Sequence, residues 1–152
     1  MPTIQESNKA RMRKFVQVVQ NDQDVDAIHR FFASDFKNPD LREMLATDQD
    51  SENDYSYSND VEGDKVLHEI LFRAFPDIKV TILDIAADGD KVWTYKLFEG
   101  THSGPWLDIP PTGKKVSFHV IDIMTFRDSM IIDHKQISEF VSTLASLRKV
   151  SD

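Results

Sequence analysis

The stretch AFPDIKVTILDIAADGDKVWTYKLFEG, residues 74–100, marks the point at which the hydrophobic pattern changes from helical to strand spacing. Before Pro76, apolar residues recur at intervals of three and four. After it, two runs rich in β-branched and aromatic residues alternate in polarity and are separated by the turn sequence DGD. The stretch therefore predicts the end of a helix followed by an antiparallel pair of strands.

The same two patterns extend the prediction to the rest of the chain. Helical spacing predicts helices over residues 6–19, 24–36 and 60–75, and a closing helix after Ser138, which can cap it. Strand spacing predicts four antiparallel strands over residues 78–87, 91–100, 114–126 and 130–137. The acidic segment 38–60 is predicted to be a mobile loop. This order predicts a single α+β domain over residues 1–152, with helices covering one face of a curved antiparallel sheet around an internal pocket.

The composition narrows the classes of partner. The 18 Lys and Arg residues against 26 Asp and Glu residues give a net charge of −8, which repels nucleic acid and anionic membrane surfaces. The absence of cysteine excludes disulfides and thiolate chemistry, and the five histidines have no metal-ligand spacing, so no metal or other cofactor is expected. No apolar run is long enough to span a bilayer, and the first residues lack a secretory pattern. We therefore expect a cytoplasmic protein that binds a small molecule.

The loop GTHSGPWLDIPPTGKKV, residues 100–116, is long for a connection between two strands. Its three prolines restrict the backbone before any ligand arrives, so the loop can hold Trp106 over the mouth of a pocket at low entropic cost. The alternative is that Trp106 only covers an edge of the core.

Two longer segments resemble a known family. AFPDIKVTILDIAADGDKVWTYKLFEGTHSGPW and IPPTGKKVSFHVIDIMTFRDSMIIDH are similar to the SnoaL-like polyketide cyclases of the NTF2-like superfamily, and the resemblance covers about residues 61–147. It implies a cone-shaped α+β barrel, a homodimer and a pocket that works without a cofactor.

The resemblance also implies candidate site residues. Asp133 matches the acid/base of characterised cyclases, His119 matches a pocket histidine, and Asn38 matches an asparagine after the second helix. Strand alternation allows Asp133 and His119 to point into one cavity, with Ser117 on the same face as His119. The alternatives are that Asp133 is a solvated acid or pairs with Lys135, and that His119 is a satisfied core histidine.

Other positions depart from the family pattern. Lys135 stands where the family often has Trp, and Tyr95 stands where it often has Arg. Lys135 either binds an acidic substrate group or lies at an exposed strand end. Trp93 and Tyr95 share a strand face and either line the pocket or belong to the core.

Two classes of function remain. The first is a cofactor-free cyclase or isomerase of a polyketide-like substrate, which uses Asp133 and His119 for acid/base catalysis. The second is a non-catalytic module for small-molecule binding or dimerisation. Epoxide hydrolysis would require an Asp-Arg-Asp cluster, for which Arg127 is poorly placed.

A homodimer is expected through the sheet face opposite the cavity. This expectation assigns four apolar strand residues to that face, which the few helices cannot all cover. They are Phe118, Val120, Met124 and Ile132.

Overall fold

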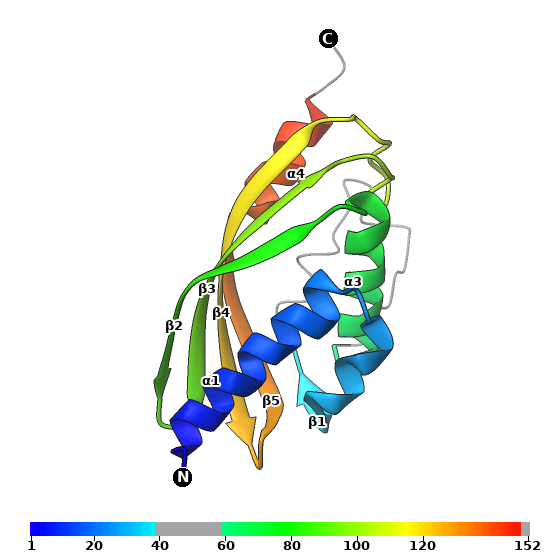
Figure 1. The fold of residues 1–152 in the computed structure, drawn as a ribbon. Helices are drawn as coiled ribbons and strands as arrows, with labels where there is room; N and C mark the ends of the chain where they lie inside the picture. Colours follow the sequence, from blue (N-terminus) through cyan, green and yellow to red (C-terminus); the bar gives the residue numbers. More distant parts are fainter. Residues whose placement is uncertain (39–58, 150–152) are drawn as a thin grey trace.

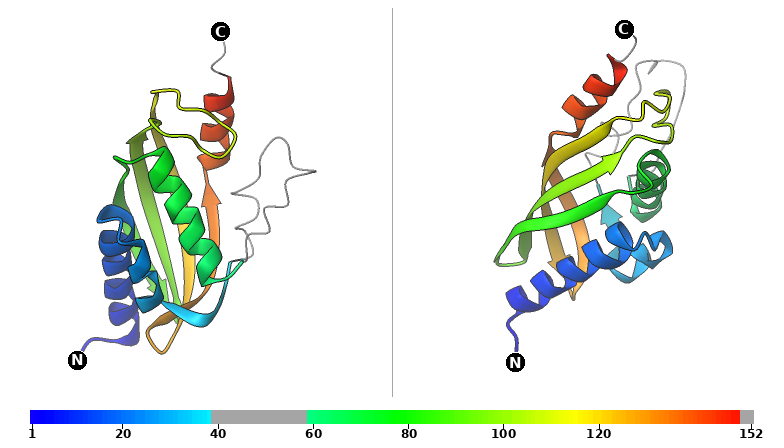
Figure 2. Two further views of the ribbon diagram at one scale, coloured as in Figure 1. Left: turned by 90° about the vertical axis from the view of Figure 1, so that its right-hand side faces the viewer. Right: turned by 45° about the horizontal axis from the view of Figure 1, so that its top comes forward.

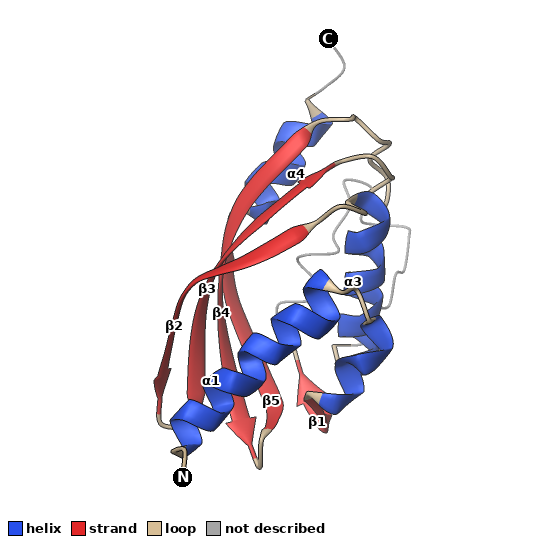
Figure 3. Cartoon of the chain, in the orientation of Figure 1, coloured by secondary structure: helices blue, strands red, loops and turns tan. Residues whose placement is uncertain are grey.

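The computed structural model describes residues 1–38 and 59–149. It contains one five-stranded curved sheet in the order β1-β5-β4-β3-β2, with helices α1 (Ile4–Phe15) and α3 (Val61–Ala74) on its concave side (Figures 1 and 3). The last helix, α4 (Phe140–Arg148), lies beside one end of the sheet. The strand order is linear, so the sheet does not close into a barrel. The predicted α+β class is confirmed, while the predicted acidic loop lies almost wholly outside the described residues.

The four predicted strands are confirmed as one meander. They are β2 (Lys79–Asp88), β3 (Lys91–Thr101), β4 (Lys115–Arg127) and β5 (Met130–Ser138). Consecutive strands pair antiparallel. The DGD turn uses Gly89 at φ +61°, a conformation that suits glycine.

The N-terminal region contains a strand that was predicted as helix. Helix α1 (Ile4–Phe15) begins with a capping box between Thr3 and Glu6 and continues as a π-helical turn, η1 (Val16–Asn21). A 3₁₀ turn, η2 (Val25–Arg30), follows, and then strand β1 (Phe32–Lys37), which pairs parallel with β5.

The helix predicted over residues 24–36 is therefore wrong in its second half. The rings of Phe32 and Phe36 stack 4.4 Å apart within the core. Two buried aromatic residues four positions apart lie on one face of a helix and also on one face of a strand, so spacing alone does not distinguish the two.

Two further helices complete the fold. Helix α3 (Val61–Ala74) begins at Asp60, whose side chain accepts a hydrogen bond from Gly63, and ends before Pro76 as predicted. It lies across the sheet, with the loop 102–114 above its C-terminal end (Figure 2). Helix α4 (Phe140–Arg148) follows β5, and Ser138 Oγ accepts a hydrogen bond from the Phe140 amide.

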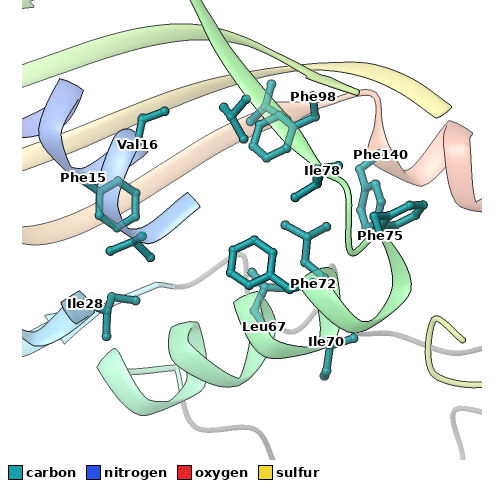
Figure 4. Packing of buried hydrophobic residues seen from close by; sticks show 14 of the residues in the cluster. Phe15, Val16, Ile28, Leu67, Ile70, Phe72, Phe75, Ile78, Phe98 and Phe140 are labelled. Atoms are coloured by element: carbon teal, nitrogen blue, oxygen red, sulfur yellow. The ribbon is translucent and has the colours of Figure 1, made fainter. Parts of the chain in front are cut away.

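The core fills the space between the helices and the concave face. Figure 4 shows Phe15 at one end, Leu67 and Phe72 of α3 in the middle, and Phe75 beside Phe140 at the other end. Phe98 extends from the sheet toward α3. We call this concave side the inner face and the opposite side the outer face.

The residues of β4 that were expected to face a second subunit lie on the inner face instead. Phe118, Val120 and Met124 are buried beneath the helices of their own chain. The outer set instead contains Ile121 and Ile123, which are half-buried in the isolated chain.

Candidate active site

A narrow cavity of about 50 Å³ lies between α3 and the inner face of the sheet. Apolar side chains form most of its wall: Phe15, Phe32, Leu67, Leu71, Phe98, Phe118, Val120, Met124 and Phe140. The volume exceeds the ~10–15 Å³ that one water molecule needs but is below the ~150 Å³ of an engineered cavity that accepts benzene. A ligand with a ring therefore requires side chains at the rim to move apart.

Six buried polar side chains from separate elements form a hydrogen-bonded series beside this cavity. We call this series the polar chain; in order, its members are His68, Gln20, Lys96, Asp122, His134 and Asn38. They come from α3, η1, β3, β4, β5 and the residue after β1, so the fold must form before the series can exist.

In the first half of the polar chain, each donor can be matched with one acceptor. His68 Nδ1 lies 2.8 Å from the Asp64 carbonyl oxygen, to which it donates, so its Nε2 is left to accept from the Gln20 amide at 3.2 Å. Gln20 Oε1 then accepts from Lys96 Nζ at 3.2 Å. Burial lowers the pKa of His68, which agrees with this neutral imidazole.

Asp122 is the central member of the polar chain. Its Oδ2 lies 2.7 Å from Lys96 Nζ and its Oδ1 lies 2.5 Å from His134 Nε2. Burial opposes ionisation, but the charges and hydrogen bonds of Lys96 and His134 outweigh it and hold the pKa of Asp122 well below its usual range. Asp122 is therefore a carboxylate, and both of its oxygens are engaged.

His134 is also held on both sides. Its Nε2 contacts Asp122, and its Nδ1 lies 3.2 Å from the side-chain amide of Asn38. Burial disfavours a charged imidazole, but the neighbouring Asp122 carboxylate overcomes this effect and raises the pKa of His134. When His134 carries the second proton, both ring nitrogens donate, so the Asn38 amide must then turn its oxygen toward Nδ1. In that form His134 places a positive charge beside the cavity.

Asp64 differs from the other acidic group. It lies on α3, is only 2% exposed and lines the cavity, yet its Oδ2 has no hydrogen-bond partner among the described residues. Burial raises the pKa of Asp64, while the nearby charges of His134 and His68 and a hydrogen bond from the Asn38 side chain reduce that rise. A desolvated carboxyl group with an available oxygen is suited to proton transfer.

Trp106 lies at the end of the cavity that is remote from Asp64. Its ring packs against Phe140 at 4.8 Å and Phe75 at 6.4 Å between centroids. Its backbone is held by two reciprocal hydrogen bonds with Ile109, of 3.0 and 2.7 Å. Trp106 belongs to the lining of the cavity, and its ring is buried in the wall, where it also serves the core.

The loop that carries Trp106 is attached to the end of α3. The backbone amides of Ser103 and Gly104 both donate to the Ala74 carbonyl oxygen. A Cβ atom on Gly104 would lie 1.9 Å from the Arg73 carbonyl oxygen, so only glycine permits this approach.

Comparison with known proteins places this site in a family. Residues 10–147 match the sequence profile of the SnoaL-like polyketide cyclases. The chain belongs to the SnoaL-like polyketide cyclase family. No functionally curated protein matches the chain in sequence.

Several solved structures share the fold. A candidate SnoaL-like polyketide cyclase from Jannaschia sp. CCS1 is 18% identical with a TM-score of 0.77, over 97% of this chain and 95% of that one. TsrD from Streptomyces laurentii is 21% identical with a TM-score of 0.75, over 93% and 94%. IdmH from Streptomyces antibioticus, a candidate polyketide cyclase, is 25% identical with a TM-score of 0.73, over 93% and 98%.

Asp133, which the SnoaL-like resemblance made the acid/base candidate, lies on the outer face. It pairs with Thr125, whereas Ile131 pairs with Phe126, so Ile132 is an extra residue in β5. This bulge reverses the alternation: Ile131 is buried in the core, while Asp133 points away from the cavity. Asp133 and His119 were expected to point into one cavity, and neither belongs to its lining.

The other strand candidates also lie on the outer face. His119 stacks on Tyr95 at 5.3 Å and binds Glu139 Oε2 at 3.1 Å. Trp93 is 46% exposed, and Ser117 and Lys135 are exposed. Of the predicted site residues, the structure thus brings only Asn38 and Trp106 to the cavity region. Both faces of β4 carry apolar residues, and the prediction assigned the outer face to the cavity.

The inner residues carried a signal that the sequence interpretation missed. Asp122 interrupts the otherwise apolar inner set of β4, and Lys96 is the charged residue in the inner set of β3, which also contains Val92, Thr94 and Phe98. One acid and one base, each within a largely apolar stripe on neighbouring strands, predict a buried ion pair. Asp64 and His68, one helical turn apart on α3, were treated only as helix residues.

The described residues contain neither a group of metal ligands nor a membrane-spanning helix. Within residues 1–38 and 59–149, no three His, Asp or Glu side chains are grouped as metal ligands. In the same ranges no helix has the length and hydropathy to cross a bilayer.

Proposed function

We propose that the protein catalyses a cofactor-independent ring closure or isomerisation of a polyketide-like carbonyl compound, with Asp64 as the acid/base. The observation that carries this proposal is the unpartnered Oδ2 of Asp64, buried in the wall of an aromatic cavity. Membership of the SnoaL-like polyketide cyclase family supports the reaction class.

The proposed reaction is an intramolecular aldol addition. Asp64 Oδ2, as a carboxylate, removes a proton from the carbon beside a carbonyl group. The enolate carbon then attacks a second carbonyl carbon of the same molecule, and the new alkoxide oxygen takes the proton back from Asp64. The product is an isomer of the substrate, so the step consumes no co-reactant.

The polar chain supports this cycle by holding charge near Asp64. The positive charge of His134 favours the carboxylate form of Asp64, and burial favours the acid form. Because these two effects oppose each other, both protonation states are accessible, as an acid/base residue requires. Lys96 and Asp122 orient His134 and take no direct part.

A ring-closure assay tests the proposal. Heptane-2,6-dione is a minimal substrate, since its aldol closure gives a six-membered ring that NMR resolves from the open chain. We expect Asp64→Asn to slow enzymatic closure by about 10²–10⁴-fold, the usual contribution of general acid–base catalysis. The matched control is Asp133→Asn, which removes a carboxylate from the outer face and should leave the rate unchanged.

A non-catalytic binding module remains the second candidate. It is favoured by the complete engagement of Asp122 and His134 with protein groups, which is typical of a structural network. Closure at the uncatalysed rate with wild-type protein, or equal rates for wild type and Asp64→Asn, would support this candidate and contradict the enzyme.

A further inference from the structure

Trp106 has a buried donor that the protein itself does not use. Its side chain is 0% exposed and lines the cavity, and its Nε1 has no hydrogen-bond partner among the described residues. Buried donors are nearly always paired in folded proteins, so an unpaired one in a cavity wall points to a ligand group. Asp64 Oδ2 is a second unpaired atom in the same wall.

The position of this donor is built into the fold. The reciprocal bonds between Trp106 and Ile109 form a tight turn in which Leu107 adopts φ +48°. The turn is also contacted by Arg148 of α4, whose guanidinium lies 3.4 Å from Asp108. The indole ring is therefore held by α3, α4 and its own turn rather than by a freely moving loop.

The two unpaired atoms lie toward opposite ends of the cavity. Asp64 and Leu71 both line it and are seven residues apart on α3, which corresponds to about 10 Å along the helix axis. Trp106 packs against Phe75, one turn beyond Leu71. A ligand that reached both atoms would be an extended molecule with oxygen atoms toward both ends.

We propose that the Trp106 indole N–H donates a hydrogen bond to a carbonyl oxygen of the ligand, at the end of a flat aromatic body remote from Asp64. An indole nitrogen only donates, so the ligand group must be an acceptor. The ring of Phe140 packs on Trp106 and on Phe118, and these aromatic rings in the cavity wall favour a flat apolar body. Trp106 is thus a specificity residue that selects aromatic ketones over the corresponding hydrocarbons.

This inference rests on the proposed function only in using the same cavity, and its test needs no turnover. The chain has two tryptophans, so ¹⁵N-labelled protein gives two indole N–H signals, which Trp93→Phe assigns. Acetophenone is the probe, and α-methylstyrene, in which a CH₂ group replaces the carbonyl oxygen, is its matched control. We expect acetophenone to move the Trp106 signal downfield while α-methylstyrene does not, and the exposed Trp93 signal to stay in place.

Affinity provides the second measurement. Trp106→Phe keeps an aromatic ring but removes the donor, so it should weaken acetophenone binding by about 2- to 12-fold, the usual net effect of one hydrogen bond, and leave α-methylstyrene binding unchanged. An unmoved Trp106 signal at saturation, equal losses for both probes, or no binding of either probe would overturn the inference. If the Trp106 signal moves downfield but the protein does not catalyse ring closure, the inference stands and the proposed catalysis is wrong. If the protein catalyses ring closure but the Trp106 signal does not move, the proposed catalysis stands and the inference is wrong.

Discussion

Two aspartates in one cavity have pKa values displaced in opposite directions. Asp122 and Asp64 are similarly buried, so desolvation opposes the charged form of each. Lys96 and His134 contact both oxygens of Asp122. Asp64 interacts with the Asn38 side chain, but its Oδ2 has no hydrogen-bond partner among the described residues. Direct partners therefore decide which carboxyl group is a permanent anion and which can exchange a proton.

The stability effect of Asp64→Asn should depend on pH. An Asp side chain has an ordinary pKa of 3.8, and burial raises that of Asp64 in the folded protein. The stability contributed by Asp64 is fully present below 3.8 and is lost as the pH rises through the raised value, because the buried carboxyl must ionise. Since asparagine does not ionise, thermal unfolding should show Asp64→Asn to be more stabilising at about pH 8 than at about pH 4. A gain that shrinks with rising pH would contradict the raised pKa.

Asp122→Asn should have the opposite effect on stability. It leaves Lys96 and His134 buried without their anion, and breaking a buried ion pair costs about 3–5 kcal/mol. Urea unfolding measures this loss. Asp133→Asn is the matched control on the outer face, where substitutions usually change the free energy of unfolding by less than about 0.5 kcal/mol. Similar losses for the two variants would mean that the polar chain does not stabilise the fold.

At the scale of elements, the contact between α3 and the loop 102–114 positions the donor end of the cavity. Gly104→Ala would place a methyl group 1.9 Å from the Arg73 carbonyl oxygen and push the loop off the helix. We expect a loss of more than about 2 kcal/mol in thermal unfolding, together with weaker binding of acetophenone. Gly89→Ala is the comparison: its Cβ would contact nothing, but φ is +61°, so it should cost about 1–2 kcal/mol and leave binding intact.

Local patterns predicted the positions of the helices and strands well, but they predicted poorly which face of each strand is buried. Pro76 and the DGD turn are local signals, and α3 and the four strands of the meander lie where those signals indicated. Which face of a strand is buried depends on long-range packing, because the helices cover only one side of β4. The bulge at Ile132 adds a reversal that a strict period of two does not anticipate.

The same limit applies to the candidate site. Trp106 was assigned to the cavity from a local feature, the stiff loop that carries it, whereas Asn38 was assigned from the resemblance to the SnoaL-like family. Asp122 and His134 lie next to outer-face positions that were expected to face the cavity, and their pairing depends on the register of β4 and β5. Of the two carboxyl groups, the structure places Asp64 and not Asp133 in the wall of the apolar cavity.

At the scale of the whole molecule, the outer face carries an apolar patch. It comprises Trp93, Tyr95, Ile121, Ile123 and Ile137, which are neighbours across β3, β4 and β5. Trp93, Tyr95 and Ile137 are 46%, 39% and 72% exposed, an arrangement that is typical of an interaction surface.

We expect this patch to mediate the homodimer, in place of the inner residues first assigned to it. Light scattering should give twice the chain mass of 17.5 kDa at micromolar concentration. Trp93→Glu should shift the protein toward the monomer by placing a charge in the interface, while Lys14→Glu, a charge reversal at an exposed position of α1, serves as the control. A wild-type monomer would remove the dimer prediction and leave the cavity chemistry unaffected.

The central claim is that the inner cavity contains one carboxyl group able to exchange a proton and one held as an anion. A single ¹³C NMR titration of the aspartate carboxyl carbons, from about pH 3 to about pH 8, measures both. We predict that Asp64 titrates above its ordinary value of 3.8 and that Asp122 stays ionised to the lowest pH at which the protein remains folded. A midpoint for Asp64 at or below 3.8 would contradict the claim, since that carboxyl group would then be a poor proton carrier near neutral pH.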